Sequence, residues 1–403
     1  MIKHADIIVV GLQAWDITIG SNSRNIALEL SKNNRVLYVN PPLDRSTLLK
    51  NKELPAVKKR IAVIKGKESG LQKVNNNLYV FYPSVLAESI NWISWKPAFN
   101  LMNRWNNKKL ADSILSVIDA LGFKNYILFN DQSMIRCYYL KEYLKPAGFI
   151  YYIRDNLTTT PYFQKHGVNL EKELIAQADA VATNSGYLAD YAKKYNPNSE
   201  MVGQGCDFSL YELQEEFPVA EAIINIKKLG PVAGYVGFLT SLRLDIKLLE
   251  EVAVKMKHWQ FVLVGPEDDA FKNSSLHHLP NVYFLGNKNP ESLPQYIKGF
   301  DVAINPQLIN EITVGNYPRK IDEYLVMGKP VVATSTPFMS YFKEHTYLGS
   351  TPDEYITLIE QAYTENNTAK EQSRRKFALQ HTWESNVNAI AELLTKSKKY
   401  NNN

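Results

Sequence analysis

The sequence predicts an α/β fold of two doubly wound domains that face each other across a cleft. The chain has 403 residues, which is too long for one ordinary core and suits two domains of about 150–200 residues. Short runs of β-branched and aromatic residues alternate with stretches of helical period along almost the whole chain. This alternation is typical of parallel sheets that are covered by helices.

Seven strands are expected in the first half of the chain, with helices between them. The helix expected at residues 21–32 begins with Ser21, a favourable N-cap, and places Ile26 and Leu30 near helical spacing. The expected strands are DIIVVG (6–11), RVLYVN (35–40), NLYVFY (77–82), YILFN (126–130), FIYYI (149–153), AVAT (180–183) and SEMVG (199–203).

The same pattern restarts after the turn-rich segment 203–218. We therefore predict an amino-terminal domain of residues 1–210 and a carboxy-terminal domain of residues 211–379. The last helix, at about residues 380–400, is a candidate to pack back on the first domain. The strands expected in the second domain are PVAGYVG (231–237), FVLVG (261–265), VYFLG (282–286), DVAIN (301–305) and PVVAT (330–334).

Composition excludes several classes of protein. Apolar residues make up 45% of the chain and charged residues 22%, as in ordinary globular proteins. Cys137 and Cys206 lack C-x-x-C spacing and the seven histidines lack metal-binding spacing, so neither a disulfide framework nor a bound metal is expected. No stretch approaches the roughly 18 apolar residues of a membrane-spanning helix, and the opening apolar run is too short for a signal peptide. We expect a cytoplasmic protein.

The net charge of +5 is unevenly spread. Residues 45–73 hold nine basic side chains against two acidic ones, Glu53 and Glu68. Nucleic acid is not an expected partner, because no recognition motif accompanies this charge. The basic residues are Arg45, Lys50, Lys52, Lys58, Lys59, Arg60, Lys65, Lys67 and Lys73.

An aromatic stripe follows the basic block. Trp92, Trp95, Phe99 and Met102 are three, four and three residues apart, as on one face of a helix, although Pro97 must start or kink that helix. Two interpretations stay open. The stripe is either a core face or, beside so many cations, a contact with the surface of an anionic membrane at the inner face of the cell membrane.

Glycines end the first expected strand of each domain, where ligands of such folds bind. Gly11 precedes a loop that brings Gly20 and Ser21 to the amino end of the first helix, a place that favours an anion. A structural turn is the alternative for Gly20. No GxGxxG is present, so a nicotinamide-binding fingerprint is absent. In the second domain Gly237 precedes Arg243 and Lys247, which either grip a phosphate or belong to a solvated first turn.

The segment NYPRKIDEYLVMGKPVVAT (316–334) combines a helix with an apolar strand. Pro318 suits the first turn of the helix and Gly328 its end. Lys320 and Glu323 are neighbours on the helix surface, and an ordinary ion pair between them is one interpretation. In the other, Lys320 neutralises a phosphate and Glu323 accepts hydrogen bonds from sugar hydroxyls. A nucleotide sugar presents both groups.

Residues 323–334, EYLVMGKPVVAT, resemble the glutamate-containing segment of GT-B-type glycosyltransferases of the large retaining family 4. The resemblance covers about residues 170–395 well and the amino half only loosely. Further segments agree in order and spacing: ADAVATNSGYLADYAKKY (178–195), VGQGCDFSLY (202–211), GYVGFL (234–239), FVLVGPEDD (261–269), LPNVYFLGNKNPESLPQYIKGFDVAINP (279–306) and HTWESNVNAIAELL (381–394).

The resemblance implies a GT-B fold of two Rossmann-like domains. It also implies retaining transfer of a sugar from a nucleoside diphosphate sugar, UDP-linked, to a saccharide or lipid-linked acceptor, with no cofactor. One departure stands out: the family pattern has two glutamates, and the position of the first is Gly315 here, with Glu311 as a candidate replacement. The remaining N-x-P-x-K-x-x-E-Y resembles a subgroup associated with cell-surface polysaccharide and teichuronic-acid-type synthesis.

By this resemblance Glu323 binds the ribose, and Arg243 and Lys320 bind the diphosphate and stabilise its charge during transfer. From the first domain, Asp155 beside Arg154 is the candidate that orients or deprotonates an acceptor hydroxyl, with Asp16 as an alternative. The nucleotide-sugar set is Gly20, Gly237, Arg243, Gly286, Asn287, Asn316, Lys320 and Glu323.

Two rival functions stay open. A nucleotide-sugar epimerase of the same fold would need acid and base residues on both sides of one sugar carbon, and no such paired set is visible. A non-catalytic nucleotide-sugar-binding protein is the second rival, because the first glutamate of the family is missing.

Overall fold

A computed structural model describes residues 2–17, 21–212 and 217–397, which form two compact units. The amino-terminal unit comprises Met1–Gly203 and Trp383–Asn403, and the carboxy-terminal unit comprises Gln204–Thr382. The division falls seven residues before the predicted boundary at 210/211. The reason is a β-bridge between Cys206 and Thr382, in which the Cys206 amide donates to the His381 carbonyl at 2.9 Å.

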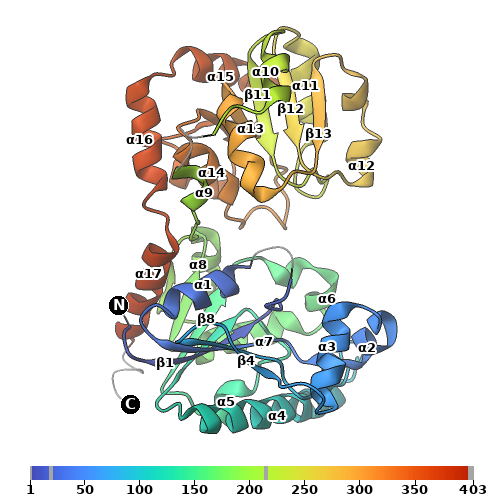
Figure 1. The fold of residues 1–403 in the computed structure, drawn as a ribbon, viewed down its shortest axis with the longest axis vertical. Coiled ribbons are helices and arrows are strands. Elements are labelled where there is room, and N and C mark those ends of the chain that lie inside the picture. The colour runs from blue at the N-terminus through green and yellow to red at the C-terminus, as the bar shows by residue number, and fades with distance from the viewer. Residues whose placement is uncertain (1, 18–20, 213–216, 398–403) are drawn as a thin grey trace. The chain divides into compact units, whose positions relative to one another are not determined.

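The amino-terminal unit is built on an eight-stranded sheet (Figure 1). Its strands are β1 (Asp6–Gly11), β2 (Arg35–Val39), β4 (Leu71–Lys73), β5 (Leu78–Phe81), β7 (Ile127–Asp131), β8 (Gly148–Ile153), β9 (Ala180–Thr183) and β10 (Ser199–Met201), beside a small pair, β3 (Leu43–Asp44) and β6 (Leu86–Ala87). Its α-helices are α1 (Asn22–Leu30), α2 (Arg45–Asn51), α3 (Pro55–Ile64), α4 (Lys96–Leu121), α5 (Leu140–Leu144), α6 (Pro161–Gln164), α7 (Gly167–Gln177), α8 (Gly186–Lys193) and α17 (Trp383–Thr395).

The strand order of this sheet is β10-β9-β8-β7-β1-β2-β5-β4, and all neighbours are parallel except β4 and β5. In the central strand β1, Val9 pairs with Tyr38 on one side and with Phe129 on the other. The strands on both sides of β1 are reached through helical crossovers and run parallel to it. The carboxyl ends of these strands therefore lie at the same edge of the sheet.

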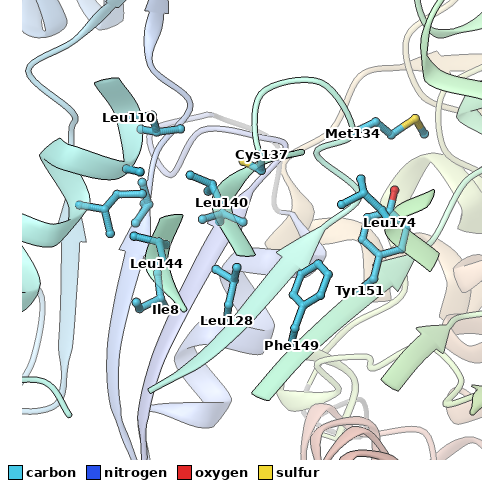
Figure 2. Packing of buried hydrophobic residues seen from close by; sticks show 14 of the residues in the cluster. Ile8, Leu110, Leu128, Met134, Cys137, Leu140, Leu144, Phe149, Tyr151 and Leu174 are labelled. Carbon is cyan, nitrogen blue, oxygen red and sulfur yellow. The ribbon is translucent and has the colours of Figure 1, made fainter. Parts of the chain in front are cut away.

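Alternate residues of each strand point to opposite faces, and each face has its own core. On one face Ile8, Leu128 and Phe149 pack with Leu110 of α4 and Leu144 of α5 (Figure 2). On the other face the neighbouring strand residues pack against α1, α3 and the returning helix α17. The resulting sheet is covered by helices on both sides, as the sequence predicts.

The predicted aromatic stripe does not form one helical face. Helix α4 begins at Lys96 with Pro97 in its first turn, where the missing N–H of proline costs nothing. Trp92 and Trp95 therefore precede the helix and are 76% and 72% exposed, whereas Phe99 is buried. Of the four stripe residues, only Phe99 and Met102 belong to the core side of α4.

The carboxy-terminal unit has a six-stranded, fully parallel sheet of order β13-β12-β11-β14-β15-β16. Its strands are β11 (Val232–Val236), β12 (Gln260–Val264), β13 (Val282–Gly286), β14 (Val302–Asn305), β15 (Val331–Thr334) and β16 (Tyr347–Gly349). Its α-helices are α9 (Ser209–Glu212), α10 (Glu221–Lys227), α11 (Ile246–Lys255), α12 (Asp269–Lys272), α13 (Leu293–Gly299), α14 (Arg319–Val326), α15 (Pro352–Thr364) and α16 (Thr368–Ala378).

One face of this sheet packs against α11 and α15. Phe261 and Leu263 of β12 form one hydrophobic cluster with Leu249 of α11 and Ile359 of α15. Helix α14 packs against α16. The two cysteines are free and buried. Across the residues that the structure describes, none of the helices has both the length and the apolar character needed to cross a bilayer.

Candidate functional site

Three glycines shape the carboxyl edge of the six-stranded sheet. Gly237 and Gly265 follow β11 and β12, Gly286 ends β13, and their φ angles are +142°, +150° and +68°. A Cβ on Gly265 would lie 1.9 Å from the Gly237 carbonyl oxygen, so the first two turns pack backbone against backbone. Side chains are excluded there, and the Gly237 amide donates to the Val264 carbonyl at 2.8 Å.

Lys320, in the first turn of α14, extends over Gly237. A Cβ on Gly237 would lie 2.0 Å from Lys320 Cε and 2.6 Å from its Nζ. The same ammonium is 5.5 Å from the centre of the Tyr235 ring, close enough for a cation–π contact. The structure thus brings Gly237 and Lys320, both predicted site residues, into direct contact.

Glu323 lies one turn after Lys320 but does not pair with it. Its Oε1 accepts a hydrogen bond from Arg319 Nε at 3.2 Å, an i,i+4 pair. The ion pair between Lys320 and Glu323 that the sequence left open is therefore absent, because Lys320 points toward Gly237. Within the described ranges of the chain, Lys320 forms no ion pair.

Helix α14 is held in place by a buried polar cluster that sequence reasoning missed. Asp322 accepts from His381 Nδ1 at 2.7 Å and from the Tyr317 hydroxyl at 2.6 Å. Burial raises the pKa of the Asp322 carboxyl, although His381 and Tyr317 act in the opposite direction. The cluster therefore anchors α14, the helix that carries Lys320 and Glu323. No local pattern signals a pair 59 residues apart.

Burial also raises the pKa of the Tyr211 phenol, and the nearby Glu323 carboxylate raises it further. Tyr211 belongs to α9, which contacts α14. The tyrosine therefore stays a hydrogen-bonding hydroxyl next to Glu323. In the sequence, Tyr211 is the last residue of segment 202–211, which resembles the glycosyltransferase family. Its contact with Glu323 was not predicted.

Arg243 lies on the loop between β11 and α11, with its side chain exposed. Its carbonyl oxygen accepts a hydrogen bond from the Leu308 amide at 2.8 Å, and Leu244 forms an antiparallel β-bridge with Gln307. These bonds join the loop of Arg243 to the loop that leads into α14. Lys247 is also exposed, on α11, whose first turn is capped by Asp245.

The remaining predicted residues of this unit lie in loops at the same sheet edge. Asn287 follows β13 and is exposed, and Asn316 precedes α14 with its amide donating to Thr313. Gly315, at the position of the first family glutamate, is buried, while Glu311 is exposed. Pro318 is the N-cap of α14 instead of a first-turn residue.

Asp155 lies in the amino-terminal unit, after β8. Its amide and carbonyl are both held by the Gln132 side chain, at 3.3 Å and 2.7 Å. Its neighbour Arg154 pairs with Asp131 at 3.2 Å, and both side chains are buried. Burial raises the pKa of the Asp131 carboxyl even though Arg154 opposes the shift.

Asp16 is neutralised inside the same unit. Its two carboxylate oxygens accept from Arg60 of α3 at 3.0 Å and 2.9 Å. Although burial acts in the opposite direction, the Arg60 contacts lower the pKa of Asp16. The alternative that Asp16 acts as a free base is therefore not supported. Gly20 lies outside the described residues, and Ser21 is the N-cap of α1, as predicted.

In the part of the chain that the structure describes, no group of three or more His, Cys, Asp or Glu side chains is arranged to hold a metal ion.

Part of the chain matches a known protein family. Residues 230–364 match the family Glycosyl transferases group 1. Over 227 residues the chain is 30% identical to the putative teichuronic acid biosynthesis glycosyltransferase TuaH of Bacillus subtilis (strain 168), a match that spans 53% of this chain and 56% of that protein. The chain thus spans about half the length of this curated relative.

Solved structures resemble the chain over nearly its whole length. Sucrose-phosphate synthase from Thermosynechococcus elongatus has a TM-score of 0.67 at 13% identity and covers 98% of this chain and 99% of its own. HepE of Anabaena, in complex with UDP and glucose, has a TM-score of 0.61 at 16% identity, covering 97% and 100%. At these identities the likeness concerns the fold, and the predicted GT-B fold is confirmed.

Proposed function

We propose that this chain, whose residues 230–364 form a Glycosyl transferases group 1 domain on a GT-B fold, is a glycosyltransferase. It transfers a sugar from a nucleoside diphosphate sugar to a saccharide or lipid-linked acceptor in cell-surface polysaccharide synthesis. The match to a putative teichuronic acid biosynthesis glycosyltransferase supports the polysaccharide role.

The observation that carries the proposal is the position of Lys320. Its ammonium lies over the backbone of Gly237, at the end of the first strand of the sheet, and has no acidic partner among the described residues. A diphosphate is an anion that suits a lysine without an acidic partner. Each charge-assisted hydrogen bond to such a ligand contributes about 1.5–3 kcal/mol.

The donor is a UDP-linked sugar in this proposal. HepE, which shares the fold, was solved with UDP and glucose. We assign Glu323 to the ribose hydroxyls, because a carboxylate accepts hydrogen bonds from vicinal hydroxyls. Gly286 and Asn287, at the end of β13, border the base, and Asn316 completes the loop before α14.

In the transfer step the bond between the sugar carbon and the diphosphate oxygen breaks, and negative charge develops on the leaving diphosphate. Lys320 and Arg243 stabilise this charge. Asp155 orients the acceptor hydroxyl and accepts its proton as the new glycosidic bond forms. Retention of the anomeric configuration follows the family resemblance of the sequence.

We further propose that the reaction takes place in the cytoplasm, at the inner face of the cell membrane. Trp95 just before α4 and Leu101 and Trp105 in its first half are exposed, and Leu49 and Lys50 are exposed on α2 in the same unit. Exposed aromatic side chains beside lysines suit an anionic bilayer surface. Pelleting with anionic liposomes should weaken as salt rises. Protein that stays in the supernatant at low salt would contradict membrane association.

Incubation of the chain with UDP-linked and GDP-linked sugars, with and without saccharide acceptors, tests the proposed activity. Release of the nucleoside diphosphate together with a glycosylated acceptor is the expected result. A changed sugar without nucleotide release would identify an epimerase instead. Binding without any turnover would identify a non-catalytic nucleotide-sugar-binding protein.

A further inference from the structure

A groove of about 580 Å³ lies in the carboxy-terminal unit, between α13, α16 and the turn that leads from α14 to β15. This size is within the range of small-molecule sites. Of its lining residues, Phe300 and Asp301 directly precede β14, and Pro330 directly precedes β15. The two strands are parallel, so their starts lie at the amino edge of the sheet. The groove is therefore at the opposite edge from Gly237, which follows β11.

Arg375 of α16 forms part of the wall of this groove. The residue is half-buried, and a Cβ on Gly328 would lie 3.2 Å from Arg375 Nε. The guanidinium thus packs on the turn that follows α14. Glu371, one turn earlier on α16, accepts a hydrogen bond from Asn366 Nδ2 at 2.9 Å. Arg375 forms no ion pair with Glu371 or with any other carboxylate among the residues that the structure describes.

Lys329 brings a second cation to the groove from the turn before β15. Its Nζ donates to the Lys298 and Phe300 carbonyls at 2.7 Å and 2.9 Å, and it forms no ion pair within the described ranges. Burial lowers the pKa of Lys329 to about 8, and the nearby Lys227 and Arg375 cations lower it further. The Lys329 ammonium is thus repelled by other cations, and a bound anion would offset this repulsion.

The lining contains two carboxylates, and both are engaged by protein groups. Asp301 accepts hydrogen bonds from Lys227 Nζ at 2.7 Å and from the Val232 amide at 2.9 Å. Glu371 accepts the hydrogen bond from Asn366 described above. The pKa of Lys329 is lowered even though both carboxylates act in the opposite direction, so positive charge is in excess. The basic residues of the lining are Lys298, Lys329 and Arg375.

An anion with several oxygens fits this excess of positive charge. A guanidinium can bind two phosphate oxygens side by side, and an ammonium meets a further oxygen as a point charge. We propose that the groove binds a phosphate group between Arg375 and Lys329, either as the free ion or as part of a small phosphorylated molecule. Since this site is at the sheet edge opposite the nucleotide site, the inference goes beyond the proposed reaction.

Calorimetric titration of the full chain with inorganic phosphate, at constant ionic strength and without nucleotide, tests this site. Binding with a dissociation constant of about 1 mM is expected. Arg375→Gln should weaken it about tenfold, and so should Lys329→Gln, which changes a different wall of the groove. Lys376→Gln is the matched control. Lys376 is the next residue of α16, is exposed and does not line the groove, so this variant should bind phosphate as the parent chain does.

Glycerol 3-phosphate distinguishes the two sources of the phosphate group. Binding at least as tight as that of inorganic phosphate would assign the groove to phosphorylated molecules, and weaker binding would assign it to the free ion. Lys320→Ala should bind phosphate as the parent chain does, so failure of the nucleotide site and failure of this site are distinguishable. No phosphate binding by the parent chain, equal binding by Arg375→Gln and Lys376→Gln, or loss of binding in Lys320→Ala would each overturn the proposal.

Discussion

The first strand of the amino-terminal unit ends in Gly11, the first strand of the carboxy-terminal unit is followed by Gly237, and the two glycines lie under different side chains. Above Gly11 of β1 is the Tyr38 hydroxyl, 2.1 Å from where a Cβ would be. Above Gly237 is the Lys320 side chain, with Cε at 2.0 Å. Tyr38 is fully buried and donates to the Gln13 carbonyl at 2.7 Å, whereas Lys320 belongs to a helix end at the sheet edge. A neutral tyrosine hydroxyl thus covers Gly11 in the amino-terminal unit, and a lysine side chain covers Gly237 in the carboxy-terminal unit.

Two arginines of the amino-terminal unit differ from Lys320 in their pairing. In the amino-terminal unit, Arg154 and Arg60 are paired with Asp131 and Asp16. Lys320 has no such partner in the described part of the chain. A similar strand-glycine-loop pattern is thus accompanied by paired arginines in one unit and, in the other, by a lysine whose positive charge is left for an anionic ligand.

The largest effect is expected for Arg154→Met, which breaks a buried ion pair. Removing the guanidinium leaves the Asp131 carboxylate buried without its counter-charge, at a cost of about 3–5 kcal/mol in the free energy of unfolding. Urea unfolding at neutral pH measures this loss. Arg319→Met, which removes the half-exposed partner of Glu323, should cost less than about 1 kcal/mol. Equal losses would contradict the contrast between the two edges.

The free energy of unfolding is expected to depend on pH through Glu171. This carboxylate accepts a hydrogen bond from Gln132, whose side chain also bonds to the Asp155 backbone. Burial raises the pKa of the Glu171 carboxyl to about 7, although Gln132 and Tyr151 oppose the shift. Between about pH 4.5 and 7 the folded chain holds a proton that the unfolded chain has lost. The free energy of unfolding should therefore fall as pH rises through this window, by about 3 kcal/mol in total.

Glu171→Gln cannot ionise and should remove this fall. Denaturant unfolding of both proteins at pH 5 and pH 8 gives the comparison. The stability of the variant relative to the parent chain should increase toward pH 8. A parallel pH dependence of the two proteins would refute the assignment of the fall to Glu171.

A smaller effect distinguishes the two glycines directly. Gly11→Ala forces a methyl group against the packed Tyr38 ring and should cost about 1–3 kcal/mol. Gly237→Ala meets the mobile end of Lys320, so the unfavourable φ of +142° remains the main cost, about 1 kcal/mol. The loss in chemical unfolding should be larger for Gly11→Ala. The reverse order would mean that Tyr38 yields more easily than Lys320.

The fold could be predicted from local patterns to a large extent. All twelve expected strands are confirmed, for example DIIVVG as β1 and PVVAT as β15, because strands buried on both faces form continuous apolar runs. The short strands β3, β4, β6 and β16 were missed, since two or three residues gain strand geometry only from their pairing partners.

The site could be predicted only in part. Lys320 and Glu323 were singled out from their helical spacing, but the competing cation Arg319 was overlooked as the partner of Glu323. The contact of Lys320 with Gly237 and that of Asp322 with His381 join segments far apart in the chain. Such contacts depend on strand order in the sheet, which spacing along the sequence does not contain.

Calorimetric titration of UDP into the parent chain and Lys320→Ala tests the central claim most directly. Lys247→Ala, at an exposed lysine of α11, is the matched control and should bind UDP as the parent chain does. Loss of the Lys320 ammonium should weaken UDP binding about 10- to 100-fold, as expected for one charge-assisted contact to a diphosphate. Equal affinity of Lys320→Ala and the parent chain, with both folded, would contradict the account.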